Sequence, residues 1–129
     1  MEPTFLTLDE IVAVHQDQIT RYGGCEGVRD WGLLQSATAM PAATFRGQWL
    51  HGDLREMAAA YLFHVVQNHP FIDGNKRVGA AAAYVFLALN NLRLNADSDA
   101  YAELVFAVAR GEMPKSAVAE FLRANTTSV

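Results

Sequence analysis

Residues 69–77 read His69-Pro-Phe-Ile-Asp-Gly-Asn-Lys-Arg77, and an alanine-rich apolar run follows them. Pro70 ends any helix that precedes it, because its ring clashes with the previous turn and it has no N–H to donate. Gly74 permits a backbone conformation closed to other residues and a close approach to a ligand. The stretch therefore predicts a sharp loop that opens a buried helix near Asn75.

The predicted loop carries groups suited to nucleotide chemistry. A helix that begins near Asn75 would point its first N–H groups and its positive dipole end in front of the loop, which suits a phosphate. Lys76 and Arg77 add two positive charges there. His69 could take a proton, and Asp73 could hold Mg²⁺. The stretch therefore predicts a site for a nucleotide and a hydroxyl acceptor.

Length and composition limit the class of protein. The chain has 129 residues, which predicts one domain over residues 1–129. Its net charge of −4 argues against a protein that binds nucleic acid in general. No uncharged run is long enough to cross a membrane, and the first residues lack the pattern of a signal peptide. Cys25 is the single cysteine, so no internal disulfide can form and a cytoplasmic location is expected.

Apolar spacing and capping signals predict an all-α fold, a compact bundle of six helices. Capping boxes at Thr7–Glu10 and Asp53–Glu56 open the first and third helices, and Asp30 caps the second. The helix after the loop is apolar nearly all round, so we expect it at the buried centre of the bundle. Outside the helices, a long loop is predicted at 41–52, a connection with a short extended piece at 92–97 and a frayed end at 126–129.

The four histidines and the cysteine need not share one role. An isolated histidine at a helix end is usually structural, so His69 gains its functional interpretation from the charged groups beside it. His15 lies on an apolar helical stripe and is expected to be structural. His64 and His69 are five residues apart and do not share a helix face, which argues against a zinc pair. Cys25 has no base beside it in the sequence, which argues against a thiol nucleophile.

The stretch 69–77 closely resembles the signature of the Fic/Doc family. The Fic pattern is His-Pro-Phe-x-(Asp/Glu)-Gly-Asn-Gly-Arg, and the Doc pattern is His-x-Phe-x-(Asp/Asn)-x-Asn-Lys-Arg. Lys76 follows the Doc pattern, whereas Pro70 and Gly74 are closer to Fic, and Val78 stands where threonine is common. Arg21–Gly24 also resembles the N-terminal segment of Doc proteins, so the resemblance covers nearly the whole chain.

The resemblance implies a function as well as a helical fold. Fic proteins typically transfer AMP from ATP to a protein hydroxyl. Doc proteins are toxins of toxin–antitoxin pairs that transfer the γ-phosphate of ATP to elongation factor Tu and stop translation. The resemblance implies that His69 is the general base and that Asp73 is a Mg²⁺ ligand. It implies that the phosphates are bound by Gly74, Asn75, Lys76 and Arg77. The loop around Phe45–Trp49 would be a flap that positions the target protein.

Lys76 favours one of the two reactions on physical grounds. Glycine at this position leaves room for the inner phosphates against the helix N-terminus, whereas lysine fills that room and adds a charge. The nucleotide could then lie in another orientation, with its γ-phosphate toward His69. We therefore expect an ATP-dependent protein serine/threonine kinase. A Fic-like AMP transferase and an inert module that binds nucleotide or peptide remain as alternatives.

Control of the protein is expected to come from a partner. The family's inhibitory helix has the pattern Ser/Thr-x-x-x-Glu-Gly/Asn, and Ser116–Glu120 is the nearest match here. Phe121 follows it where glycine or asparagine is expected. The sequence therefore predicts a separate antitoxin whose C-terminal segment folds as an amphipathic helix in a groove on this protein.

Overall fold

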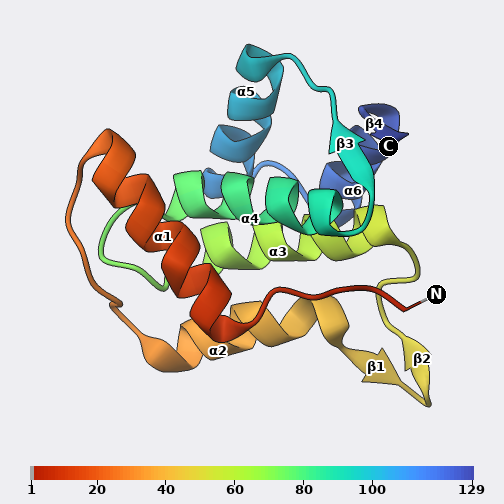
Figure 1. The fold of residues 1–129 in the computed structure, drawn as a ribbon, viewed down its shortest axis with the longest axis horizontal. Helices are drawn as coiled ribbons and strands as arrows, with labels where there is room; N and C mark the ends of the chain where they lie inside the picture. Colours follow the sequence, from red (N-terminus) through yellow and green to blue (C-terminus); the bar gives the residue numbers. More distant parts are fainter. Residues whose placement is uncertain (1) are drawn as a thin grey trace.

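The computed structural model describes residues 2–129, and over this range it contains six α-helices and four very short strands (Figure 1). The predicted all-α bundle is therefore confirmed. The helices are α1 (Leu8–Tyr22), α2 (Trp31–Ala39), α3 (Leu54–Asn68), α4 (Asn75–Leu89), α5 (Ser98–Ala109) and α6 (Lys115–Ala124). No helix in the described range is both long and apolar enough to cross a membrane.

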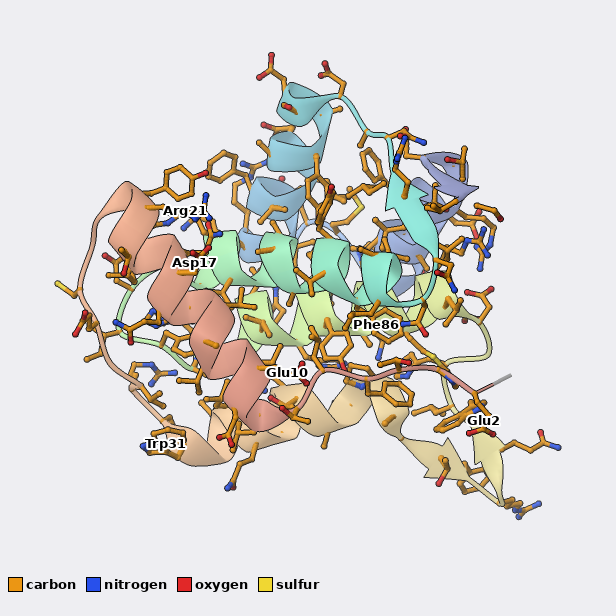
Figure 2. All side chains as sticks on the ribbon, viewed as in Figure 1. Glu2, Glu10, Asp17, Arg21, Trp31 and Phe86 are labelled. Carbon is orange, nitrogen blue, oxygen red and sulfur yellow. The ribbon has the colours of Figure 1, made fainter. Side chains whose placement is uncertain are left out.

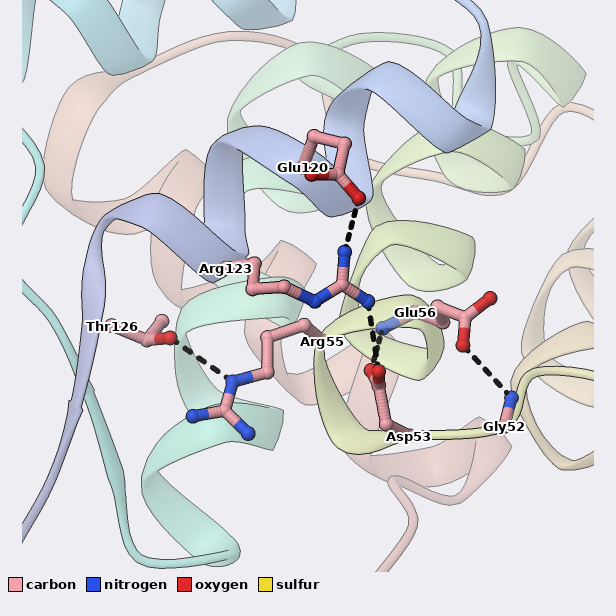
Figure 3. Close-up of polar contacts among 7 residues, drawn as sticks. All are labelled: Gly52, Asp53, Arg55, Glu56, Glu120, Arg123 and Thr126. Atoms are coloured by element: carbon pink, nitrogen blue, oxygen red, sulfur yellow. Dashed lines mark hydrogen bonds and ion pairs between the residues drawn. The ribbon is translucent and has the colours of Figure 1, made fainter.

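The helix starts follow the capping signals of the sequence. Thr7 and Glu10 form the predicted capping box at α1, and the Asp30 side chain accepts from the Leu33 N–H at the start of α2. At α3 the Asp53 carboxylate accepts from the Glu56 N–H as expected. The reciprocal bond differs, however, because the Glu56 carboxylate accepts from the N–H of Gly52 rather than from that of Asp53 (Figure 3).

Helices α3 and α4 lie side by side in the middle of the molecule, and α1 packs across α4 (Figure 1). Helix α3 also contacts α2, α5 and α6, so α3 and α4 together form the centre of the bundle. Gly79 lets them approach closely, since a Cβ there would lie only 2.7 Å from a Val66 methyl group. Figure 2 shows Phe86 of α4 beside the N-terminal segment, where its ring stacks on Phe5 at 5.8 Å.

Two regions predicted as irregular contain short strands. Residues 41–52 hold the end of a 3-10 turn (Met40–Ala42) and a small hairpin of β1 (Thr44–Phe45) with β2 (Gln48–Trp49). The second region is the chain end, where β4 (Thr126–Ser128) pairs antiparallel with β3 (Leu92–Leu94), so the predicted frayed end is wrong. Strand β3 confirms the short extended piece predicted within 92–97. Strands of two or three residues give no alternating pattern to read, and the partners of β4 lie more than thirty residues away in sequence.

Polar contacts tie the C-terminal part to the start of α3 (Figure 3). Arg123 of α6 donates to the Asp53 carboxylate at 2.8 Å and also pairs with Glu120. Arg55 donates to the Thr126 hydroxyl at 3.2 Å. These contacts, together with the strand pairing, fix the chain end far from residues 69–77 (Figure 1).

A half-buried pair between α3 and α6 gives folding stability a pH dependence. The Lys115 ammonium donates to His64 Nε2 at 3.0 Å, so this nitrogen must be unprotonated. Burial and the charge of Lys115 lower the pKa of His64 to about 4. As the pH falls, His64 of the unfolded chain binds a proton near pH 6.5, whereas His64 of the folded protein binds it only near pH 4. The resulting stability is therefore complete above pH 6.5 and is lost as the pH falls toward 4.

Between pH 7 and pH 5 the free energy of unfolding should fall by about 1 kcal/mol on account of His64, a value reduced to allow for its partial exposure. Urea denaturation at the two pH values measures the change. His64→Gln should remove this part of the pH dependence. An equal fall in the variant and the wild type would contradict the assignment to His64.

Candidate active site

The loop between α3 and α4 turns through two left-handed residues. Helix α3 ends at His69, whose φ is +51°, and α4 begins after Gly74, whose φ is +81°. Glycine adopts this conformation without strain, as the sequence predicted for Gly74. Pro70 and Phe71 between them are buried. The loop therefore joins the two central helices at one end of the bundle, with its polar residues facing outward.

Two buried side chains hold the loop from inside. The Asn75 amide group accepts from the Phe71 N–H at 2.9 Å and donates to the Phe71 carbonyl at 3.0 Å. His15 of α1 stacks on the Phe71 ring with centroids 4.0 Å apart, and its Nε2 lies 2.9 Å from the Asp73 carbonyl oxygen. The side chain of Asn75 is thus used within the loop. Its part in phosphate binding remains a prediction.

The Asp73 carboxylate is oriented by two backbone donors. Oδ1 accepts from the Gly74 N–H at 2.8 Å, and Oδ2 accepts from the Cys25 N–H at 3.1 Å. These bonds, with a smaller contribution from the Arg77 charge, lower the pKa of Asp73, which is therefore ionised at neutral pH.

The donor set at Asp73 fits Mg²⁺ in a nucleotide complex. Within residues 2–129 no three His, Cys, Asp or Glu side chains gather as a complete metal site. Mg²⁺ bound with a nucleotide needs less from the protein, since one or two carboxylates suffice when phosphates and water complete the shell. Asp73 is thus a suitable single ligand, and its metal role remains a prediction.

One cavity of about 370 Å³ brings the predicted site residues together. The residues that line it are His69, Asp73, Gly74, Asn75, Lys76 and Arg77, joined by Val66, Ile72 and Ala109. The His69 side chain is exposed and has no hydrogen-bond partner among residues 2–129, so its imidazole is available to a ligand. The roles assigned to the six predicted residues remain predictions. Val66 of α3 and Ala109 of α5 also line the cavity, and no sequence pattern predicted that they would.

The segment 23–30, between α1 and α2, packs along the loop and was missed as part of the site. Val28 forms a bridge with Phe71, and the Ile72 N–H donates to the Gly27 carbonyl at 3.1 Å. The Cys25 N–H reaches Asp73, as described above. Gly24 and Gly27 allow the chain to lie close to the loop, since a Cβ on Gly24 would lie 2.5 Å from an Asp73 carboxylate oxygen and one on Gly27 would lie 2.9 Å from an Ile72 methyl group. Cys25 therefore contributes through its backbone.

The hairpin of β1 and β2 does not lie where the resemblance placed a flap. It precedes α3, whereas the loop follows α3, and a helix of 15 residues is about 22 Å long. Figure 1 shows the two at opposite ends of the central pair. The Trp49 ring packs against Phe5 at 5.4 Å, and no residue of the hairpin lines the cavity. The prediction that Phe45–Trp49 positions the target at the site is therefore wrong.

A bundle with this loop at the head of a central helix defines a member of a known family. The model of the Fic/DOC family matches residues 5–87, and the chain belongs to this family. Toxin Doc of Mycolicibacterium smegmatis is 46% identical over 78 residues, which is 60% of this chain and 60% of that protein. Protein kinase doc of Escherichia phage P1 is 35% identical over 115 residues, which is 89% of this chain and 90% of that protein.

Proposed function

We propose that this protein is a Doc-like toxin that transfers the γ-phosphate of ATP to a serine or threonine hydroxyl of elongation factor Tu and so arrests translation. The observation that carries the proposal is Lys76 in the first turn of α4, lining one cavity with His69 and Asp73. The relative from phage P1, which bears the name of a protein kinase, supports the choice of reaction.

Each residue of the cavity has a part in the proposed transfer. The hydroxyl oxygen attacks the γ-phosphorus, the bond from that phosphorus to the bridging oxygen breaks, and ADP leaves. His69 accepts the hydroxyl proton. Lys76, Arg77 and the first N–H groups of α4 neutralise the phosphate charge. Asp73 would hold Mg²⁺, which would supply positive charge where negative charge develops on the phosphate.

The proposal is tested by incubating purified protein with elongation factor Tu and with ATP labelled at either the α- or the γ-phosphate. Label on elongation factor Tu from γ-labelled ATP alone supports the kinase. Label from the α position identifies an AMP transferase instead. ATP binding without transfer to any protein of a cell extract identifies a binding module. Each outcome excludes the other two.

A groove beside the cavity supports the proposal of an antitoxin partner. Helices α1, α4 and α5 line an open hollow of about 550 Å³, where the small side chains of Ala80 and Ala81 leave room. Tyr22 and Tyr84 line it and are more than half exposed, so they leave apolar surface uncovered. Arg77 lines both this groove and the cavity. An amphipathic helix in the groove would therefore lie next to the proposed phosphate site.

Expression of the protein alone should arrest growth, and co-expression of the antitoxin encoded beside it should restore growth. Tyr84→Asp should still arrest growth but should weaken antitoxin binding at least tenfold, because a charge would enter the apolar groove. Isothermal titration and growth curves measure both effects. Phe45→Asp, on the distant hairpin, is the matched control and should behave as the wild type. If the antitoxin restored growth of cells that express Tyr84→Asp and bound the variant with unchanged affinity, this groove would be excluded as the docking site.

A further inference from the structure

One arginine outside the cavity binds the backbone of the proposed catalytic base. Arg29 Nε donates to the His69 carbonyl at 2.7 Å, and its Nη2 donates to the Asn68 carbonyl at 3.0 Å. The backbone N–H groups of Arg29 and Asp30 both donate to the Pro70 carbonyl, at 2.7 Å and 3.1 Å. The three consecutive carbonyl groups of Asn68, His69 and Pro70 are thus held by two consecutive residues of the segment 23–30.

These carbonyl groups lie where α3 ends and its own hydrogen bonds stop. The last carbonyls of a helix have no partner within it, and they form the negative end of its dipole. A guanidinium group suits this position because it is charged and presents two donors in a rigid fork. Lysine has the charge but lacks the fork. The side-chain type at Arg29 is therefore matched to the geometry it binds.

The conformation of His69 is one that a non-glycine residue seldom adopts. Its φ of +51° lies in the left-handed region, a position at a helix end usually occupied by glycine or asparagine. Its N–H donates to the Val65 carbonyl at 3.3 Å, a long bond. The direction of the Cα–Cβ bond follows from φ and ψ, so whatever fixes the backbone of His69 also directs its imidazole.

We infer that Arg29 is a positioning residue: by binding the carbonyls of Asn68 and His69 it fixes the left-handed backbone that directs the His69 imidazole into the cavity. The inference rests on the proposed function for its kinetic consequence. Arg29 does not line the cavity, whereas Gly74, Lys76 and Arg77 do. Loss of Arg29 should therefore impair the proton-transfer step and leave nucleotide binding intact.

The kinetic test compares Arg29→Ala, Arg29→Lys and the wild type in the transfer of γ-phosphate to elongation factor Tu. For Arg29→Ala, kcat should fall at least tenfold while KM for ATP stays within twofold. Added guanidinium chloride at millimolar concentration should recover part of the lost rate, and Arg29→Lys should be intermediate. Arg93→Ala, an exposed arginine on β3, is the matched control and should keep the wild-type rate. An unchanged kcat, or a KM that rises in proportion to the loss of rate, would overturn the inference.

A second measurement does not depend on catalysis. The backbone carbon chemical shifts of His69 in a uniformly labelled sample report its left-handed conformation, and in Arg29→Ala they should move away from the wild-type values. Left-handed shifts retained in Arg29→Ala would overturn the inference whatever the enzyme does. A wild type that transfers no phosphate would instead refute the proposed function, and the shifts would still decide the role of Arg29.

Discussion

Replacing His69 with alanine is expected to lower phosphoryl transfer by about 10²–10⁴-fold while the bundle keeps its fold. Among the described residues His69 is the only histidine that lines the cavity, and its side chain is exposed. Truncation therefore removes the proton acceptor without leaving a buried polar group unpaired. Transfer of γ-label to the proposed target, elongation factor Tu, measures the loss, and circular dichroism measures the fold.

Two further variants make the His69 experiment specific. His69→Asn should be as inactive as His69→Ala, because asparagine tolerates the left-handed backbone but is not a base. His64→Ala, in the preceding helix α3 and paired with Lys115 of α6, should keep the wild-type rate at pH 7. Growth arrest by His69→Ala at the wild-type protein level would show that His69 is not the general base.

Asp73→Asn is expected to reduce the Mg²⁺-dependent rate by about 10²-fold, the order found when a group that stabilises transition-state charge is removed. The amide keeps the size of the side chain and an acceptor for one of its two backbone donors, so the loop should stay in place. Titration of the variant with ATP, with and without Mg²⁺, separates the effect on metal binding from the effect on nucleotide binding. The variant should lose affinity for the magnesium complex and keep its affinity for ATP alone.

Equal losses of ATP affinity with and without Mg²⁺ would exclude a metal role for Asp73. Asp99→Asn, an exposed carboxylate in the first turn of α5, serves as the matched control. It should change neither affinity. A control is needed because any change of net charge in this acidic protein alters the attraction of a polyanion to its surface.

The parts of the fold that the sequence predicted depend on local signals. Thr7, Asp30 and Asp53 accept hydrogen bonds within three residues, so their capping roles can be recognised from spacing alone. Pro70 and Gly74 mark the ends of the loop for the same reason. The nine-residue motif is also local, and its six candidate site residues line one cavity.

The parts that could not be predicted depend on contacts between distant residues. Arg29 meets His69 across 40 residues, and His15 meets Asp73 across 58. Neither pair follows from a periodic pattern, because nothing in the spacing shows which surfaces meet after folding. Asn75 is a different case, because the sequence shows it within the motif but the Phe71 backbone groups that its amide binds are apparent only in the folded loop.

The segment 23–30 has a consequence for how the site is lost. Most of its residues are exposed, whereas α3 and α4 bury large side chains against each other. Proteins open in separate cooperative units, and units with little buried surface open at a lower free energy than the core. Detachment of this segment would release the hydrogen bonds at Asp73, His69 and Pro70 while the bundle remains intact. The free energy that keeps the site assembled is therefore that of a local opening, smaller than the free energy of global unfolding.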